Sequence, residues 1–207
     1  MSRTVRTVET RHGPARLHRL SSARGGAATI VLGHGAGGGV EAVDLRSLGA
    51  ALGAAGFAIV LVEQPWRVAG RRVAPSPSVL DEGWLDAVRA LRPRGPLVVG
   101  GRSAGARVAC RTASDLGAVG VLALAFPLHP PGRPERSRVG ELAECPVPTV
   151  VVQGDSDPFG SAAEIVAWRL PIRVVEVAGG DHGLSRADLS PAVAEVAEWL
   201  AMIDPRE

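Results

Sequence analysis

The sequence predicts an α/β fold in which a mostly parallel central sheet carries helices on both faces. From residue 28 onward, apolar runs rich in Val, Ile and Leu alternate with segments that repeat apolar residues at helical spacing. The apolar runs carry almost no charge, which is typical of strands buried on both faces of a parallel sheet. A length of 207 residues fits one domain, residues 1–207, with a full core.

The N-terminal segment is the expected exception to the parallel arrangement. Two short strand-like runs flank His12, Gly13 and Pro14, and they predict an antiparallel hairpin at an edge of the sheet. The later apolar runs predict the remaining strands. The expected strands cover residues 4–10, 15–20, 28–32, 57–62, 97–99, 119–125, 149–152 and 172–177.

Helical periodicity fills the spaces between these strands. Gly56 is expected to stop the first helix, and Ser78 is expected to cap the second. Ser190 and Pro191 are expected to cap and start the last helix. The expected helices cover residues 45–55, 78–91, 106–111, 161–170 and 190–200.

The stretch LVVGGRSAGARVAC, residues 97–110, contains the most informative motif. Residues 101–105 fit the pattern G-x-S-x-G between an expected strand and an expected helix. This is the pattern of a nucleophile elbow, a sharp turn on which a serine tolerates only small neighbours. The pattern therefore predicts Ser103 as a nucleophile, with the backbone N–H of Ala104 at a helix N-terminus, where developing negative charge is favoured.

A glycine-rich loop, GHGAGGG at residues 33–39, follows an early apolar strand. A phosphate-binding role is disfavoured because the loop lacks the Lys-Ser/Thr of a P-loop and the spacing of a dinucleotide fingerprint. We interpret it as an oxyanion loop that supplies a second donor, the N–H of Ala36; a plain flexible turn is the alternative. His34 is expected to shape this loop without transferring protons, and it is a candidate for substrate contact.

An acid and a histidine follow two later strands. His182 is the expected base, because a serine hydroxyl needs a proton acceptor to react at neutral pH. Asp157 and Asp155 compete as the carboxylate that orients the imidazole, and Asp157 is preferred because it is followed by Pro in a turn. Asp181 is expected to stabilise its own loop. The order Ser, Asp, His is that of α/β-hydrolases.

Several other residues are candidates for substrate binding. Trp66 and Arg67 open a loop of about 15 residues after a strand, a position that often carries function. Arg102 precedes Ser103. His129 lies in the Pro- and Arg-rich segment of residues 126–148, which is too short for a lid domain; a bland loop histidine is the alternative. Arg71 and Arg72 are either solvated loop residues or contacts for an acidic substrate.

Composition limits the other function classes. The net charge is +2, and all 23 basic residues are Arg. Because these are spread along the chain and aromatic residues make up 3%, nucleic-acid binding is disfavoured. The His residues lack metal-ligand spacing, and no cofactor is implied. Cys110 and Cys145 form no disulfide framework. No apolar run is long enough for a membrane span, and a polar N-terminus predicts a cytoplasmic protein.

The segments LGHGAGGG, GGRSAGARVA, FPLHPPGRPE, VQGDSDPFG and GDHGL resemble the small α/β-hydrolase family that includes testis-expressed protein 30. That family also includes the hydrolase-like domain of a subunit of the nonspecific lethal chromatin complex, and it is distantly similar to dienelactone hydrolases. The resemblance implies an α/β-hydrolase fold with a minimal or absent cap. It also implies nucleophile, acid and base at Ser103, Asp157 and His182, and it adds support to Asp157 over Asp155.

These features predict a serine hydrolase that cleaves a small ester, thioester or related acyl substrate through an acyl-enzyme. The expected partner is therefore a small molecule, without nucleic acid, membrane, metal or cofactor. A binding or scaffold module on the same fold is the alternative, because some members of the resembled family act in that way.

Overall fold

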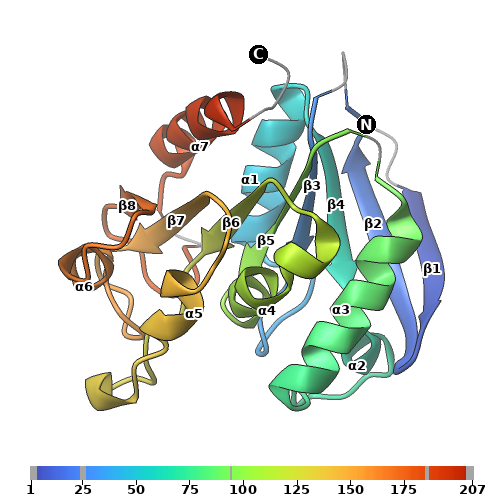
Figure 1. Cartoon of the computed structure of the whole chain (residues 1–207), viewed down its shortest axis with the longest axis horizontal. Helices are drawn as coiled ribbons and strands as arrows, with labels where there is room; N and C mark the ends of the chain where they lie inside the picture. Colours follow the sequence, from blue (N-terminus) through green and yellow to red (C-terminus); the bar gives the residue numbers. More distant parts are fainter. Residues whose placement is uncertain (1–3, 24–26, 94, 185–186, 204–207) are drawn as a thin grey trace.

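A computed structural model describes residues 4–23, 27–93, 95–184 and 187–203. The strands form an eight-stranded sheet in the order β1-β2-β4-β3-β5-β6-β7-β8 (Figure 1). The strands are β1 (Thr4–Thr10), β2 (Gly13–Ser21), β3 (Thr29–Gly33), β4 (Ala58–Glu63), β5 (Leu97–Arg102), β6 (Gly120–Leu124), β7 (Thr149–Gly154) and β8 (Arg173–Val177).

The direction of the strands follows the sequence pattern. β1 and β2 form an antiparallel hairpin, and β2 pairs antiparallel with β4. All the other pairings, from β4 through β3, β5, β6 and β7 to β8, are parallel. Every residue of β3 and β6 is buried, as expected for strands covered on both faces. The predicted mostly parallel sheet with an N-terminal edge hairpin is confirmed.

Helices cover both faces of the sheet (Figure 1). Helices α1 and α7 pack on one face, around Leu45, Leu52 and Trp199. Helices α3, α4, α5 and α6 pack on the other, where Trp84 fills the space between strands and helices. The helices are α1 (Val43–Ala54), α2 (Pro65–Val68), α3 (Pro77–Leu91), α4 (Ala104–Thr112), α5 (Val139–Ala143), α6 (Ala162–Ala167) and α7 (Ser190–Met202), with 3-10 turns η1 (Ser114–Leu116) and η2 (Pro134–Arg136).

Three local predictions differ from the structure. The loop after β4 contains a short helix, α2, that starts at Pro65, a residue whose fixed φ suits a first helical position. Ser78 lies inside α3, because Pro77 starts that helix and Ser76 occupies the N-cap without a side-chain bond. Ser190 likewise starts α7 and does not cap it, since the N-cap position is Leu189.

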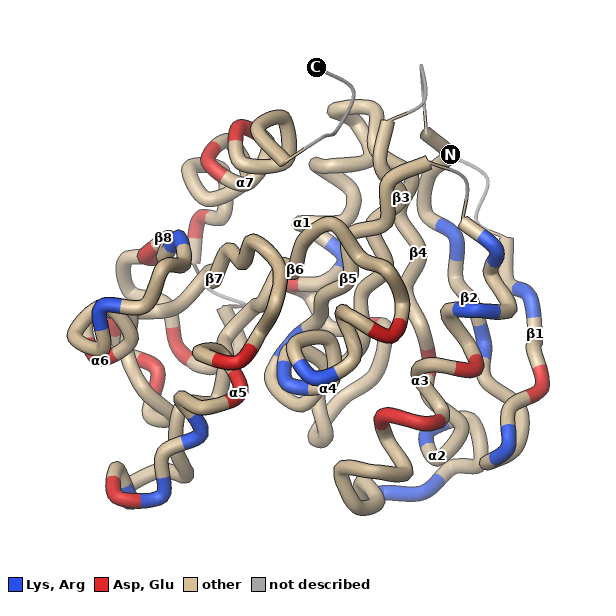
Figure 2. Tube along the Cα trace, viewed as in Figure 1, with Lys and Arg blue, Asp and Glu red and all other residues tan. Residues whose placement is uncertain are grey.

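Charged residues are distributed over the molecule. Arg residues occur on β1, β2, α4 and the segment before α5, and acidic residues lie among them (Figure 2). Several of these charges are paired, as in Arg111 with Asp81 and Arg107 with Glu141. Within the described ranges, no helix is both long and apolar enough to cross a membrane.

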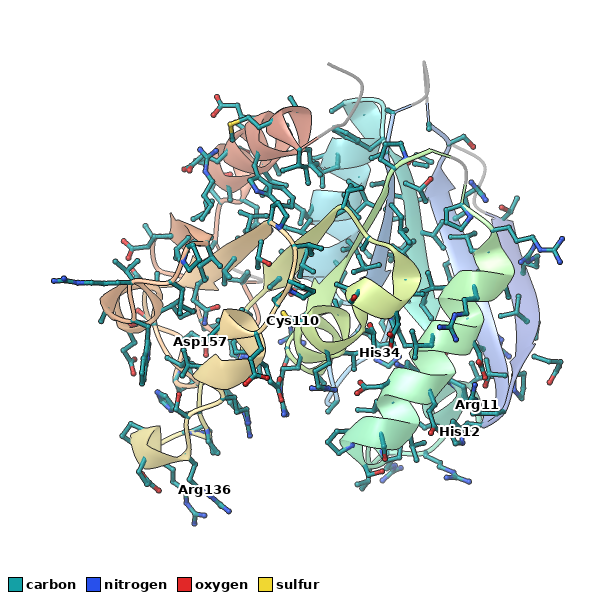
Figure 3. All side chains as sticks on the ribbon, viewed as in Figure 1. Arg11, His12, His34, Cys110, Arg136 and Asp157 are labelled. Carbon is teal, nitrogen blue, oxygen red and sulfur yellow. The ribbon has the colours of Figure 1, made fainter. Side chains whose placement is uncertain are left out.

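The carboxyl ends of the parallel strands meet at one edge of the sheet, and the loops that follow β3, β5, β7 and β8 gather there. Residues 125–148, between β6 and β7, carry only η2 and α5. This segment extends beyond the sheet edge, with Arg136 near its tip (Figures 1 and 3). The segment is therefore a minimal cap, as predicted.

Candidate active site

Ser103 occupies a strained turn between β5 and α4. Its φ of 53° and ψ of −112° lie outside the regions that a residue with a side chain usually adopts. A conformation of this kind costs about 1–3 kcal/mol and persists only where the surroundings hold it. Here the Ser103 N–H donates to the carbonyl of Leu124, at the end of β6, over 2.9 Å. The turn lifts the hydroxyl off the end of the strand.

The two glycines of the motif let this turn pack against β3. Gly101 has a φ of +153°, and a Cβ placed there would lie 2.8 Å from the backbone nitrogen of Gly33. A Cβ on Gly105 would lie 2.6 Å from the carbonyl carbon of Gly33. Real Cβ atoms do not approach backbone so closely, so both positions require glycine. The G-x-S-x-G spacing is thus explained by contact with β3.

The structure brings Ser103, His182 and Asp157 together, although they come from three separate loops. The Ser103 hydroxyl oxygen lies 2.9 Å from Nε2 of His182. On the other side of the ring, Nδ1 lies 2.8 Å from Oδ2 of Asp157. The Asp157 side chain is fully buried, and that of His182 is 18% exposed. This geometry allows the ring to hold Nδ1–H towards the carboxylate and to accept a proton at Nε2.

Asp157 is held by two donors that sequence reasoning did not identify. The fully buried Gln153 at the end of β7 donates from Nε2 to Oδ2 of Asp157 over 3.0 Å. The backbone N–H of Phe159 donates to Oδ1 over 2.8 Å. The Phe159 ring also stacks on His182, with ring centroids 4.1 Å apart. A lone amide side chain at the end of an apolar strand, four residues before the acid, was the available sequence signal for Gln153.

The two other aspartates near the site bind their own loops. Asp155 accepts from the backbone N–H of Gly179 and from the hydroxyl of Ser156, and these bonds lower the pKa of Asp155. Asp181 accepts from the backbone N–H of Gly183 over 2.8 Å. Neither is the partner of His182 Nδ1, which lies against Asp157. The arrangement therefore favours Asp157 over Asp155 as the orienting carboxylate.

Ala36 and Ala104 line the same small cavity, of about 10 Å³, beside the serine turn. Ala104 is the first residue of α4, where backbone N–H groups lack intrahelical partners and the helix dipole favours negative charge. Ala36 comes from the loop after β3, next to Gly35, whose Cβ would lie 3.4 Å from that of Ser103. The two proposed oxyanion donors thus belong to segments that meet at the nucleophile.

His34 fastens this loop to the neighbouring strand. Its Nδ1 donates to the carbonyl of Gly35 over 3.0 Å, and its Nε2 accepts from the backbone N–H of Gln64 over 3.1 Å. Burial lowers the pKa of His34, because a charged ring would lose hydration. Both ring nitrogens are engaged, so His34 shapes the loop and offers substrate only its ring surface.

Trp66 and Arg67, on α2, have different surroundings. Trp66 is 5% exposed, lines the small cavity and packs against His34 with ring centroids 5.5 Å apart. Its indole N–H has no hydrogen-bond partner in the part of the chain that the structure describes. Arg67 lies 3.4 Å from Glu41 near the surface. Arg71 lines a second cavity of about 150 Å³ with Trp66 and Val79, and Arg72 is exposed.

Arg102 links the loops around the site. Its Nη2 donates to the backbone carbonyl of His182 over 3.0 Å. Its Nε lies 2.9 Å from Oδ2 of Asp44, without the alignment of a hydrogen bond, so this contact is an ion pair. The Asp44 side chain is 2% exposed, and burial raises its pKa while Arg102 opposes that shift. These contacts favour a positioning role for Arg102 over substrate contact, and Asp44 is a further residue that the sequence did not indicate.

His129 is bound by protein groups. Its Nδ1 faces the carbonyl of Pro130 over 3.0 Å, and its Nε2 faces Glu164 over 2.9 Å. Acceptors at both nitrogens raise the pKa of His129, the Pro130 carbonyl having the larger effect. The backbone N–H of His129 donates to the carbonyl of Phe159, which stacks on His182. His129 therefore supports the acid loop, and its ring nitrogens are not free for substrate.

One family model covers most of the chain. The family model described as "Alpha/beta hydrolase domain" matches residues 26–201. No curated protein matches significantly. Among the residues described, no three His, Cys, Asp or Glu side chains gather as a metal-binding group would.

Solved structures show the fold. An α/β serine hydrolase without a lid from Xanthomonas campestris has a TM-score of 0.74 at 19% identity, covering 100% of this chain and 97% of that one. An α/β serine hydrolase homologue from Coxiella burnetii has a TM-score of 0.74 at 17% identity, covering 98% and 97%. A dienelactone hydrolase from Anabaena variabilis has a TM-score of 0.69 at 16% identity, covering 97% and 95%.

Proposed function

Because the chain belongs to the alpha/beta hydrolase domain family, we propose that it is a serine hydrolase that cleaves a small ester, thioester or related acyl substrate. The observation that carries this proposal is the continuous contact from the Ser103 hydroxyl through His182 to the buried Asp157. A serine hydroxyl is a poor nucleophile by itself, and a histidine at 2.9 Å is placed to accept its proton. The family relationship and the contacts among Ser103, His182 and Asp157 thus both support hydrolysis by an activated serine.

The proposed reaction has two halves. Ser103 Oγ forms a bond to the substrate carbonyl carbon while its proton moves to Nε2 of His182, and the carbonyl oxygen becomes an oxyanion held by the N–H groups of Ala36 and Ala104. The bond to the leaving group then breaks, and His182 returns the proton to that group. Water next attacks the acyl carbon while its proton moves to His182. The bond between that carbon and Ser103 Oγ then breaks, His182 returns the proton to Oγ, and the carboxylic acid leaves. Asp157 stabilises the imidazolium in both halves.

Arg102 and Gln153 act in this proposal as positioning residues. Arg102 holds the backbone of His182, and Gln153 holds the carboxylate of Asp157. In the proposed reaction, neither side chain contacts the reacting atoms. The finer relationship to the group that includes testis-expressed protein 30 rests on sequence segments alone and is part of the proposal, as is a cytoplasmic location.

The decisive experiment is the intact-protein mass after treatment with a fluorophosphonate. We expect one adduct on the wild-type protein and none on Ser103→Ala, because the probe reacts with an activated serine beside an oxyanion hole. Ser78→Ala, at an exposed serine on α3, is the matched control and should be labelled like the wild type. An ester and thioester panel with the same variants then measures turnover.

Two outcomes would contradict the proposal. A folded wild-type protein that forms no adduct would favour the non-catalytic binding or scaffold module, and partner capture would then be the appropriate next step. Turnover that survives in Ser103→Ala would show that Ser103, His182 and Asp157 are not the catalytic residues. Circular dichroism of each variant separates a loss of chemistry from a loss of folding.

A further inference from the structure

The small cavity beside Ser103 carries an inference about the substrate. We propose that the acyl group transferred to Ser103 is as short as acetyl, because this cavity receives it. The inference rests on the proposed serine-hydrolase function. It adds a substrate class that neither the family nor the fold implies.

The direction of the acyl group follows from the geometry of the attacked carbon. That carbon binds Ser103 Oγ, the oxyanion, the leaving group and the acyl chain. The leaving group must lie beside Nε2 of His182, which returns its proton. The oxyanion lies at the N–H groups of Ala36 and Ala104. The acyl chain is then directed away from His182. The cavity lies on that side of the serine turn, because its lining residues come from the loops after β3 and β4 and from α3 and α4, and none comes from the loops that carry Asp157 and His182.

The cavity is very small. Its volume is about 10 Å³, which leaves room for about one water molecule. A methyl group is of similar size, so an acetyl group fits with little adjustment. Each further methylene group would require the side chains that line the cavity to move apart. A neighbouring cavity of about 150 Å³ shares Gln64 and Trp66 with this one, and the rest of its lining is different.

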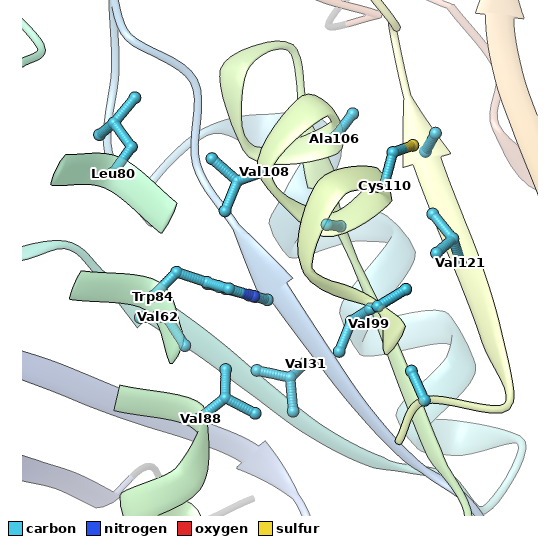
Figure 4. Close-up of a cluster of buried hydrophobic side chains, with 14 of the residues drawn as sticks. Val31, Val62, Leu80, Trp84, Val88, Val99, Ala106, Val108, Cys110 and Val121 are labelled. Carbon is cyan, nitrogen blue, oxygen red and sulfur yellow. The ribbon is translucent and has the colours of Figure 1, made fainter. Parts of the chain in front are cut away.

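The walls of this cavity are held by the core. Leu80 on α3 and Val108 on α4 are 9% and 1% exposed, and both belong to the cluster that surrounds the fully buried Trp84 (Figure 4). His34, labelled in Figure 3, is fixed by hydrogen bonds at both ring nitrogens. Extra methylenes forced into such packing are destabilising, because side chains must leave their preferred rotamers and the backbone must shift. The walls therefore cannot move easily, and a longer acyl chain would bind only by disturbing the core packing.

The chemistry of the walls also suits a short alkyl group. Trp66, Leu80, Val108 and Ala74 present apolar surface, and no Arg or Lys lines the cavity. Gln64 is engaged, since its Nε2 donates to the carbonyl of Leu80 over 3.0 Å. A carboxylate carried into this space would have no cationic partner, and burying an unpaired charge is expensive.

The test uses the 4-nitrophenyl esters of acetate, butyrate and octanoate, with the hydrolysis seen in Ser103→Ala subtracted. We expect kcat/KM for acetate to exceed that for butyrate at least tenfold, with octanoate lower again. The leaving group is the same in all three esters. A difference between them therefore reports the acyl side alone.

Two variants locate the cause of this selectivity. Leu80→Ala removes part of the cavity wall, and the ratio of kcat/KM for butyrate to that for acetate should rise at least tenfold. Val79→Ala is the matched control, because it truncates the adjacent residue of α3, which lines the neighbouring cavity. It should leave the ratio unchanged within about twofold. If Leu80→Ala does not fold, the wild-type series decides by itself.

The outcomes separate this inference from the function on which it rests. A protein that is labelled at Ser103 by the fluorophosphonate, yet hydrolyses butyrate or octanoate as fast as acetate or hydrolyses none of them, would overturn the short-acyl inference alone. No adduct and no turnover would overturn both. A preference for acetate that Leu80→Ala leaves unchanged would also overturn the assignment of this cavity.

Discussion

The buried pair of Asp44 and Arg102 gives a quantitative prediction for Asp44→Asn. The side chains of Asp44 and Arg102 are 2% and 17% exposed, and Nε and Oδ2 lie 2.9 Å apart. Removing one partner of a buried ion pair leaves the other charge uncompensated, at a cost of about 3–5 kcal/mol. Arg102 keeps its bond to the His182 carbonyl and some contact with water. Burial raises the pKa of Asp44, so the ionised carboxylate is itself costly in the folded protein and asparagine removes part of that cost. We therefore expect Asp44→Asn to lower the free energy of unfolding by about 3 kcal/mol, the lower end of that range.

Urea unfolding followed by circular dichroism measures this effect. Glu41→Gln is the control, because the Glu41–Arg67 pair is 3.4 Å long with side chains 67% and 35% exposed. An exposed pair of this kind contributes about 0–1 kcal/mol, so the control should stay close to the wild type. If Asp44→Asn unfolds at the same urea concentration as Glu41→Gln, the buried pair does not stabilise the fold and the reasoning fails.

A double-mutant cycle and an activity assay test the same pair further. Replacing both members of a buried pair by apolar residues is often nearly neutral, so Asp44→Leu with Arg102→Met should cost less than the sum of the two single changes. In the proposed hydrolase, Asp44→Asn should also lower kcat while KM changes little, since Arg102 holds the backbone of His182 and not the substrate. If other variants that are equally destabilised lose as much kcat as Asp44→Asn, the positioning role of Arg102 is contradicted.

Three further predictions concern single residues. Gln153→Leu should lower kcat about ten- to hundredfold with KM nearly unchanged, because a hydrogen bond to a charged group contributes about 1.5–3 kcal/mol; unchanged kcat in steady-state assays would contradict it. Lowering the pH from 7 towards 5 should reduce the contribution of His34 to stability, because the pKa of His34 is lowered in the folded protein and the unfolded histidine takes up a proton near pH 6.5. Urea midpoints should therefore depend less on pH in His34→Gln than in the wild type over this range. Gly105→Ala should prevent folding or cost several kcal/mol, whereas Gly37→Ala, with nothing within 4 Å of its added Cβ, should be tolerated in the same unfolding assay.

The sheet could be predicted from the sequence because its strands are buried on both faces. The continuous apolar runs of β3, β5, β6 and β7 are visible without any partner. Parallel strands bring their following loops to one edge, so the meeting of Ser103, Asp157 and His182 could also be anticipated. The choice of Asp157 over Asp155 needed the turn sequence, and the observed contact of His182 is with Asp157.

The supporting residues could not be predicted in the same way. Asp44 looks like an ordinary polar residue near a helix start, and only its contact with Arg102 across the fold explains its burial. Gln153 is hidden in the same manner, since its partners are backbone groups and an acid on neighbouring loops. Arg102 and His129 resembled substrate ligands because their intramolecular partners, His182 and Glu164, are distant in sequence.

The packing of Gly101 and Gly105 on β3 also limits how the sequence can vary. Most tight contacts between side chains can be relieved by a smaller residue on the other side, which makes the two positions change together. Here the atoms that a new Cβ would meet are the backbone nitrogen, carbonyl carbon and oxygen of Gly33, which every residue carries. No substitution at position 33 can therefore compensate for a side chain at 101 or 105. In a library that randomises all three positions, glycine at 101 and 105 should be selected independently of the residue at 33, without covariation.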